Sequence, residues 1–185
     1  MINKKTLIRT IDAYLNHYPV ENNTLADLRA RIENGDDVCD KENFKGHITC
    51  SLALVYPTHK KVLMVYHGVL QRWLLPGGHV EESDRNLASA AVRELVEETH
   101  VKMDIEGISA QLIQIDRHSI PSNHSRNHPQ HDHWDFRYLT FVGCEFDSVA
   151  ERTEVHATAW RDLRNIPLEL RCRINLSVAR GVMRI

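Results

Sequence analysis

The sequence lacks any hydrophobic run approaching the roughly 20 apolar residues of a membrane-spanning helix. Its first residues, MINKKTLIRT, are basic but have no apolar segment of signal-peptide length. The net charge is only −2 with histidine neutral, so no excess of positive charge favours nucleic acid or a membrane surface. We therefore expect a cytoplasmic protein that acts on a small molecule, without a nucleic-acid or membrane partner.

Cysteine is also scarce, with four residues at wide spacing: Cys39, Cys50, Cys144 and Cys172. No Cys-x-x-Cys pair occurs, so the spacing indicates neither a zinc site nor a redox motif, and free thiols in a reducing compartment are expected. The sequence has no Gly-x-Ser-x-Gly motif either. Its absence argues against an α/β-hydrolase triad, although twelve histidines offer many bases.

A chain of 185 residues with 42% apolar and 26% charged residues is typical of one globular domain, here with an appendage. Residues 1–45 predict a helical arm, whose first helix carries apolar residues at helical spacing: Leu7, Ile8, Ile11 and Leu15. Pro19 ends that helix, Thr24 caps a second one, and Asn34 and Gly35 stop it. We expect the arm to serve packing or formation of a homodimer.

From residue 46 the pattern changes to short β-strands. Residues 47–56 and 61–66 predict two strands joined by a turn, and residues 73–75 predict a short third strand. A helix over residues 85–99, a strand within 101–115 and a polar loop over 117–130 follow. Strands are expected at 134–142 and 155–160, before a C-terminal helix with apolar residues spaced by four: Leu170, Ile174, Val178 and Val182.

Three carboxylates share one face of the helix predicted at residues 85–99. On a helical wheel, Glu94, Glu97 and Glu98 fall within an arc of about 100°. The helix also carries an apolar stripe beside them: Leu87, Ala88, Ala91, Val92 and Leu95. Like charges at this spacing repel one another near a low-dielectric core, and a bound cation would remove the repulsion. Carboxylate oxygens are the ligands that Mg²⁺ prefers, often together with phosphate oxygens of a substrate.

The turn before this helix suits the same chemistry. The Pro-Gly-Gly sequence at residues 76–78 lets a backbone approach a ligand closely. We expect Ser83 or Asp84 to cap the helix, whose N-terminus would be a modest anion site. Arg93 lies one turn before Glu97 and can hold a carboxylate in a fixed rotamer. A solvated acidic helix face explains the charge but not its combination with the glycine turn.

The same residues resemble the Nudix box, Gly-x5-Glu-x7-Arg-Glu-apolar-x-Glu-Glu-x-Gly-apolar. The matching residues are Gly78, Arg93, Glu94, Leu95, Glu97, Glu98 and Val101. Three features depart: Asp84 replaces the first glutamate, eight residues separate it from Arg93, and His100 replaces the closing glycine. We expect His100 to adopt a left-handed conformation at the helix end. The departures affect the ends of the helix and leave the three glutamates in register.

The resemblance to the Nudix hydrolase family implies an α/β fold, a mixed β-sheet sandwiched between helices, over residues 46–185 with the box at about 78–101. It also implies hydrolysis of a phosphoanhydride bond in a nucleoside diphosphate linked to another moiety. Glu94, Glu97 and Glu98 would bind Mg²⁺ or Mn²⁺, and Glu97, Glu98 and Arg93 would be catalytic. The arm and the GGHVE sequence are similar to a bacterial Nudix subgroup of ill-defined substrate.

Further candidates lie outside the box. In the strand near residue 134, alternation places His131, His133, Asp135 and Arg137 on one face, with Trp134, Phe136 and Tyr138 on the other. With Gly78, we predict His133 and Asp135 as substrate-binding residues; a His-rich solvated loop is the alternative. One or two of three other histidines would line the site: His47, His67 and His79. A base outside the box could come from an acid in a later loop: Glu145, Glu151 or Glu154.

Two other classes of function remain open at this point. The first is a Nudix-fold ligand sensor or regulator without catalysis, against which the complete set of box acids argues. The second is a metal-dependent isomerase, for which Cys50 is the one hint. Trp73 and Trp134 could stack on a base, but aromatic residues in short strands more often belong to the core.

Overall fold

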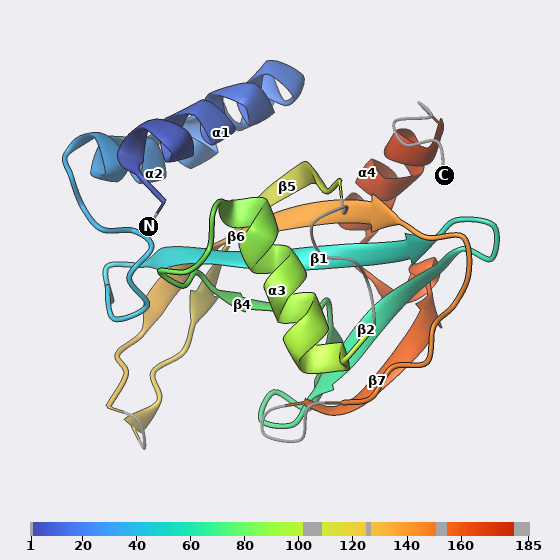
Figure 1. Cartoon of the computed structure of the whole chain (residues 1–185). Coiled ribbons are helices and arrows are strands. Elements are labelled where there is room, and N and C mark those ends of the chain that lie inside the picture. The colour runs from blue at the N-terminus through green and yellow to red at the C-terminus, as the bar shows by residue number, and fades with distance from the viewer. Residues whose placement is uncertain (1, 102–108, 125–126, 151–154, 180–185) are drawn as a thin grey trace.

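The computed structural model describes residues 2–101, 109–124, 127–150 and 155–179. These form a mixed sheet with helices on both faces, which confirms the predicted fold class (Figure 1). The helices are α1 (Lys4–His17), α2 (Asn22–Glu33), α3 (Leu87–Thr99) and α4 (Leu168–Ala179). The strands are β1 (His47–Tyr56), β2 (Lys61–His67), β3 (Arg72–Leu74), β4 (Gly77–His79), β5 (Gln111–Ile120), β6 (His131–Phe141) and β7 (Val155–Asp162).

The strand order β3-β2-β1-β6-β5 places β1 at the centre of the sheet. β1 and β6 are parallel and run in register from His47 opposite His133 to Val55 opposite Phe141. The short β4 pairs antiparallel with the first half of β1, and β7 pairs with β2. Since β1 is buried along nearly its whole length, its predominantly apolar sequence follows from its central position.

The two faces of β1 belong to different cores. Its residues at even positions, such as Ile48 and Leu52, pack with the apolar stripe of α3. Ala53 and Val55 face the other side and pack in the core that contains Leu170 of α4. In β6, Trp134 and Phe136 lie in the α3 core, so the intervening side chains of β6 point to the opposite face.

The helical arm, α1 and α2, packs against the main sheet (Figure 1). The apolar residues that it buries belong to the same core as α3: Ile2, Leu7, Ile11, Tyr14, Leu25, Leu28 and Ile32. The hydroxyl of Tyr14 accepts hydrogen bonds from the Ile115 amide of β5 (3.3 Å) and from Arg173 Nη1 of α4 (2.9 Å). α2 begins at Asn22 with Glu21 as its N-cap, so the prediction that Thr24 caps it is wrong.

Three further predictions differ from the structure. β4 forms where a loop was expected, because its glycines pair with β1 and have no side-chain pattern of their own. β5 and β6 form a ribbon through residues predicted as a polar loop, with Ile120 opposite His131. In α4, Leu170 and Ile174 are buried as predicted, but Val178 is exposed and Ser177 is buried in its place, with its hydroxyl donating to the Arg173 carbonyl. Val182 lies outside the described residues.

Among the described residues, no helix combines the length and the apolar character needed to cross a membrane.

Candidate active site

The N-terminus of α3 is capped by Asn86 and not by Ser83 or Asp84 as predicted. The Asn86 side chain accepts from the Ser89 amide (2.9 Å), and the Ser89 hydroxyl accepts from the Asn86 amide (3.0 Å). This reciprocal capping box satisfies two of the free amides at the start of the helix. The cap lies two residues after Asp84, which leaves the Asp84 side chain available for another contact.

Asp84 contacts Arg93 of α3 with both carboxylate oxygens. Oδ1 accepts from Arg93 Nε (3.1 Å), and Oδ2 accepts from Arg93 Nη2 (3.2 Å). Oδ2 also accepts from the amide of Glu81, which closes the turn between β4 and α3 (2.8 Å). Because the Asp84 side chain is only 4% exposed, this bidentate ion pair is shielded from water.

The guanidinium of Arg93 connects this turn with the acidic face of α3. Nη2 donates to the backbone carbonyl of His79 in β4 (2.7 Å). Nη1 donates to Glu94 Oε1 (3.0 Å) and to Glu97 Oε2 (2.8 Å). One side chain therefore fixes the positions of β4, the turn and two of the three box glutamates.

The box glutamates lie against the glycines of β4. A Cβ atom built on Gly78 would lie 2.6 Å from Glu94 Oε1, so only glycine leaves room for this carboxylate. The amide of Gly77 donates to Glu98 Oε2 (3.0 Å), whereas the Glu97 side chain is 53% exposed. Burial raises the pKa of Glu94, and the neighbouring Arg93 opposes that shift.

The donor set of this site fits a hard divalent cation, since it offers carboxylate oxygens beside a glycine cradle. Arg93 holds Glu94 and Glu97 in the positions described above, and their oxygens with those of Glu98 do not form a compact triplet. In the described part of the chain, the group with three ligand atoms within 4.8 Å of one another consists of His47, His79 and His133.

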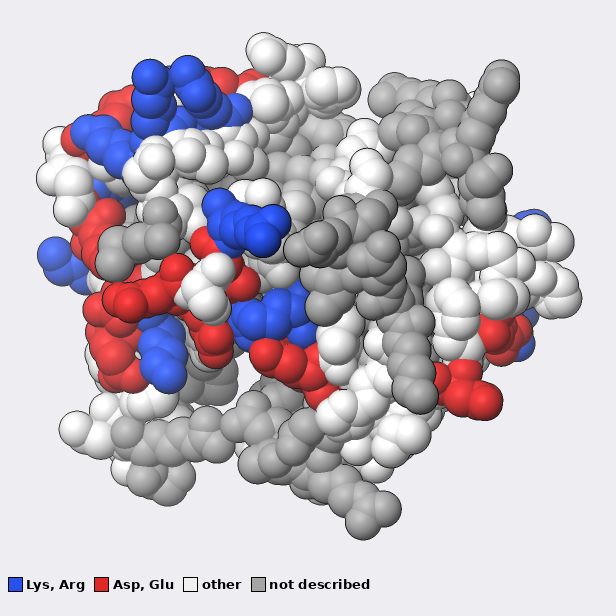
Figure 2. Space-filling view, in the orientation of Figure 1, with Lys and Arg blue, Asp and Glu red and all other residues white. Residues whose placement is uncertain are grey.

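A cavity of about 750 Å³ adjoins the acids, between the box turn and the connector that follows α2. Figure 2 shows that acidic side chains gather over this part of the surface. The polar residues that line the cavity are Asp37, Asp40, Lys41, His79, Glu81, Glu82, Ser83 and Glu94. A cavity with this excess of acids fits an anionic substrate only if cations bind with it.

On the sheet face opposite α3, Asp135 is held in a polar network. Its Oδ2 accepts from the Ser51 hydroxyl of β1 (2.9 Å) and from Arg137 Nε (2.9 Å). Arg137 Nη2 also donates to Asp116 of β5 (2.7 Å). Asp135 is buried, and both partners of its Oδ2 are side chains of the sheet, one in β1 and one in β6 itself.

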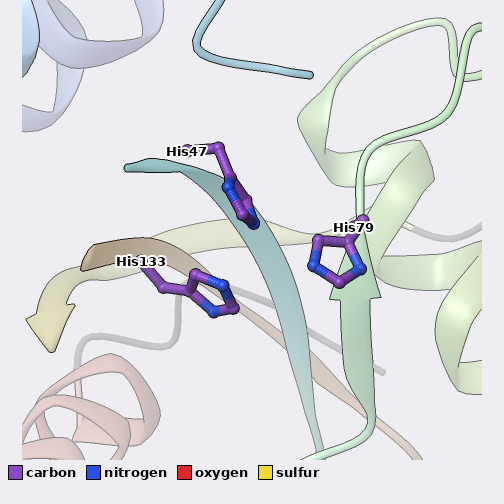
Figure 3. Close-up of side chains that lie close together, drawn as sticks. All are labelled: His47, His79 and His133. Atoms are coloured by element: carbon purple, nitrogen blue, oxygen red, sulfur yellow. The ribbon is translucent and has the colours of Figure 1, made fainter. Parts of the chain in front are cut away.

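The same face brings three of the candidate histidines together. His133 of β6 lies beside His47 of β1, with ring centroids 4.5 Å apart, and His79 of β4 lies 5.1 Å from His47 (Figure 3). His67 is not part of this group, because it lies at the end of β2, where its Nδ1 accepts from the Leu70 amide. Sequence spacing alone could not reveal the group, since its members come from three strands.

The other candidates named from the sequence are a base outside the box, two tryptophans and Cys50. Glu145 forms an ion pair with Lys61 (2.6 Å) at the opposite end of β1, while Glu151 and Glu154 lie outside the described residues. Trp134 is fully buried in the core, and burial raises the pKa of the Cys50 thiol, which makes it a poor nucleophile. Trp73 is half-buried beneath Arg161.

Residues 47–175 match the NUDIX domain family. The chain belongs to this family. A protein of Lactococcus lactis subsp. cremoris, described as a probable DHNTP pyrophosphohydrolase, is 37% identical over 99 residues. The matched part covers 54% of this chain and 57% of that relative, so the likeness spans little more than half of either protein.

Solved structures share the fold at low sequence identity. The dihydroneopterin triphosphate pyrophosphohydrolase of E. coli gives a TM-score of 0.54 at 20% identity, over 72% of this chain and 95% of that one. The NUDIX domain of Shewanella oneidensis NrtR, solved with ADP ribose, gives 0.53 at 21% identity, over 75% and 93%. At these identities the likeness concerns the fold alone.

Proposed function

We propose that this NUDIX protein is a divalent-metal-dependent hydrolase that cleaves a phosphoanhydride bond in a nucleotide-type substrate. The observation that carries the proposal is the arrangement around Arg93, which contacts Asp84, Glu94, Glu97 and the His79 carbonyl together. Such an arrangement restrains Glu94 and Glu97 beside β4, and a bound cation would draw their oxygens together with those of Glu98.

Glu94, Glu97 and Glu98 would hold Mg²⁺ or Mn²⁺, which when bound neutralises phosphate charge and lowers the pKa of a bound water. Arg93 keeps Glu94 and Glu97 oriented. It also counters the repulsion between these two carboxylates when no cation is bound. Gly78 gives Glu94 the room to reach the β4 edge. The substrate-binding roles predicted for Gly78, His133 and Asp135 are part of this proposal.

Two classes of substrate deserve the first tests. The relative from Lactococcus lactis is named for dihydroneopterin triphosphate, and the Shewanella NUDIX domain was solved with ADP ribose. We propose that the substrate is a nucleoside diphosphate linked to another moiety, or a triphosphate that carries a bicyclic base, as dihydroneopterin triphosphate does. Both contain the anhydride bond that the box would cleave.

The test is a panel of such compounds, incubated with Mg²⁺, with Mn²⁺ or with a chelator, and analysed for released phosphate or pyrophosphate. We expect Glu97→Gln to lower kcat by about 100-fold or more, because a carboxylate ligand is lost. Glu169→Gln is the matched control, since Glu169 is also an exposed helical acid paired with an arginine at four residues' distance. Full activity in Glu97→Gln would contradict the proposed metal site. Tight binding of one compound without cleavage would instead favour a ligand sensor.

A further inference from the structure

We propose that His47, His79 and His133 form a second cation site, one that selects a transition metal of the Zn²⁺ type. This histidine site is distinct from the box carboxylates and goes beyond the hydrolytic function proposed above, since it gives His133 a metal-ligating role in addition to the substrate contact proposed there. Its three side chains come from β1, β4 and β6 and converge on one side of the sheet (Figure 3). One ligand atom from each lies within 4.8 Å of the other two.

Strand register creates this convergence. His47 is directly opposite His133 in the parallel pair of β1 and β6, so both side chains leave the sheet on the same face. His79 is opposite Thr49 in the antiparallel pair of β4 and β1, on the other side of β1. The three imidazoles are therefore presented by rigid neighbouring strands, which is how precise metal sites are built.

His47 has a buried nitrogen that lacks a partner. The residue is 1% exposed, and its Nε2 has no hydrogen-bond partner within the described ranges. Its other nitrogen, Nδ1, lies 3.4 Å from the backbone carbonyl of Asn43, an acceptor, and therefore carries the proton. Nε2 then presents a lone pair toward the group. Ligating histidines commonly have their second nitrogen bonded to a carbonyl in this way.

A similar argument identifies which ring nitrogen of neutral His133 carries the proton. His131 Nδ1 lies 2.8 Å from the Pro129 carbonyl and must donate to it, which leaves His131 Nε2 as an acceptor. The 3.2 Å contact between His131 Nε2 and His133 Nε2 is then donated by His133. His133 Nδ1 consequently keeps its lone pair. His131 thus acts as a positioning residue for the proposed site.

The state of the imidazoles favours a cation over a phosphate. The N–H of His47 is directed at the Asn43 carbonyl and that of His133 at His131 Nε2, so in each ring the remaining nitrogen is an acceptor with a free lone pair. A cation accepts such lone pairs, whereas a phosphate oxygen needs donors. A phosphate subsite at this group is thus the weaker explanation.

The ligand type also separates this site from the box. Imidazole nitrogen suits Zn²⁺, Co²⁺, Ni²⁺ and Cu²⁺, whereas Mg²⁺ prefers the oxygens of Glu94 and its neighbours. Zn²⁺ with three protein ligands keeps a fourth position open. His79 alone of the three histidines lines the cavity beside Glu94, so the histidine site adjoins the box site through β4.

The test is titration of the tag-free protein with Co²⁺ in excess Mg²⁺, followed by visible absorption. We expect one Co²⁺ per chain, with the strong ligand-field bands of a four-coordinate site, and its displacement by one equivalent of Zn²⁺. His79→Gln should weaken Co²⁺ binding by at least about 100-fold, because it removes a direct ligand. His79 is exposed, so this variant should fold even if His47→Gln does not. His59→Gln, in the exposed turn before β2, is the matched control and should bind as the wild type does.

Three results would overturn the proposal. They are no Co²⁺ binding in excess Mg²⁺, equal affinity in the wild type and His79→Gln, and a thiolate-to-cobalt charge-transfer band, which would indicate a cysteine such as Cys39 at the cavity wall. The measurement requires no turnover. A failed substrate panel and a failed titration are therefore distinguishable.

Discussion

Adjacent glycines of β4 make different contacts, and the same substitution at each should affect different properties of the protein. A Cβ on Gly78 would lie 2.6 Å from Glu94 Oε1, at the end of a side chain. A Cβ on Gly77 would lie 2.6 Å from the Cys50 carbonyl and 2.7 Å from Ser51 Cα, which are backbone atoms of the central strand. We therefore predict that Gly78→Ala impairs catalysis and that Gly77→Ala impairs folding.

In Gly78→Ala the carboxylate must move by about 0.8 Å to reach an ordinary contact distance of 3.4 Å. The Glu94 side chain can rotate, so the free energy of unfolding should fall by only about 1 kcal/mol. A displacement close to 1 Å in a group that orients the reaction lowers turnover by about 100-fold. Mg²⁺ is especially sensitive to such displacement because it requires near-octahedral geometry.

In Gly77→Ala, by contrast, β1 or β4 must shift. Overpacking against backbone should lower the free energy of unfolding by about 3 kcal/mol, and the Tm by about 6–12 °C for a domain of this size. Kinetics under saturating substrate and thermal unfolding of both variants would check the pair. If Gly78→Ala lowers the Tm as much as Gly77→Ala while its kcat per folded molecule is normal, the assignment of the Gly78–Glu94 contact to catalysis is wrong.

Three further predictions concern the rest of the chain. Asp84→Asn should lower kcat about tenfold and stability by about 1–2 kcal/mol, measured by kinetics and urea unfolding, because Arg93 loses a buried anion but keeps two glutamates. Tyr14→Phe should lower the free energy of unfolding by about 1–3 kcal/mol, since it removes the hydroxyl that accepts from Ile115 and Arg173; an unchanged urea midpoint would refute this link between arm and core. Metal-free protein should lose stability as the pH falls from 6.5 toward 4, because unfolded His47 takes up a proton that folded His47, with a pKa of about 4, does not. The slope from His47 is at most about 1.4 kcal/mol per pH unit and adds to that of His133, whose pKa burial lowers to about 2. In His47→Gln the total slope, measured by urea unfolding across this range, should therefore become shallower but not vanish.

The part of the fold that could be predicted from sequence is the part with a local pattern. The bounds of β1 agree with the prediction to the residue, because Gly46 and Pro57 flank a run rich in β-forming residues. His100 has φ 48° and ψ 25°, which confirms the predicted left-handed end of α3. β4 could not be predicted, since a strand of Gly-Gly-His is defined only by its pairing with β1.

The histidine group shows the same limit at the level of the site. His47 and His79 are distant in sequence from His133, and they meet only through the registers of two strand pairs. A single sequence contains no signal for such registers beyond the apolar alternation of β6. Alternation did correctly separate Trp134 from Asp135, which lie on opposite faces.

Two different residues cap α3 and orient Arg93, and this accounts for the departures from the usual box at the start of the helix. The N-cap of α3 is Asn86, two residues after Asp84, so capping does not depend on the acid of the turn. Asp84, shorter than the usual glutamate, remains in the turn and reaches Arg93 with both oxygens while also accepting from the Glu81 amide. One residue therefore closes the turn and orients the arginine, and another begins the helix. The register from Arg93 to Glu98 is unaffected by the insertion, which is why the acidic face of α3 still meets the glycines of β4.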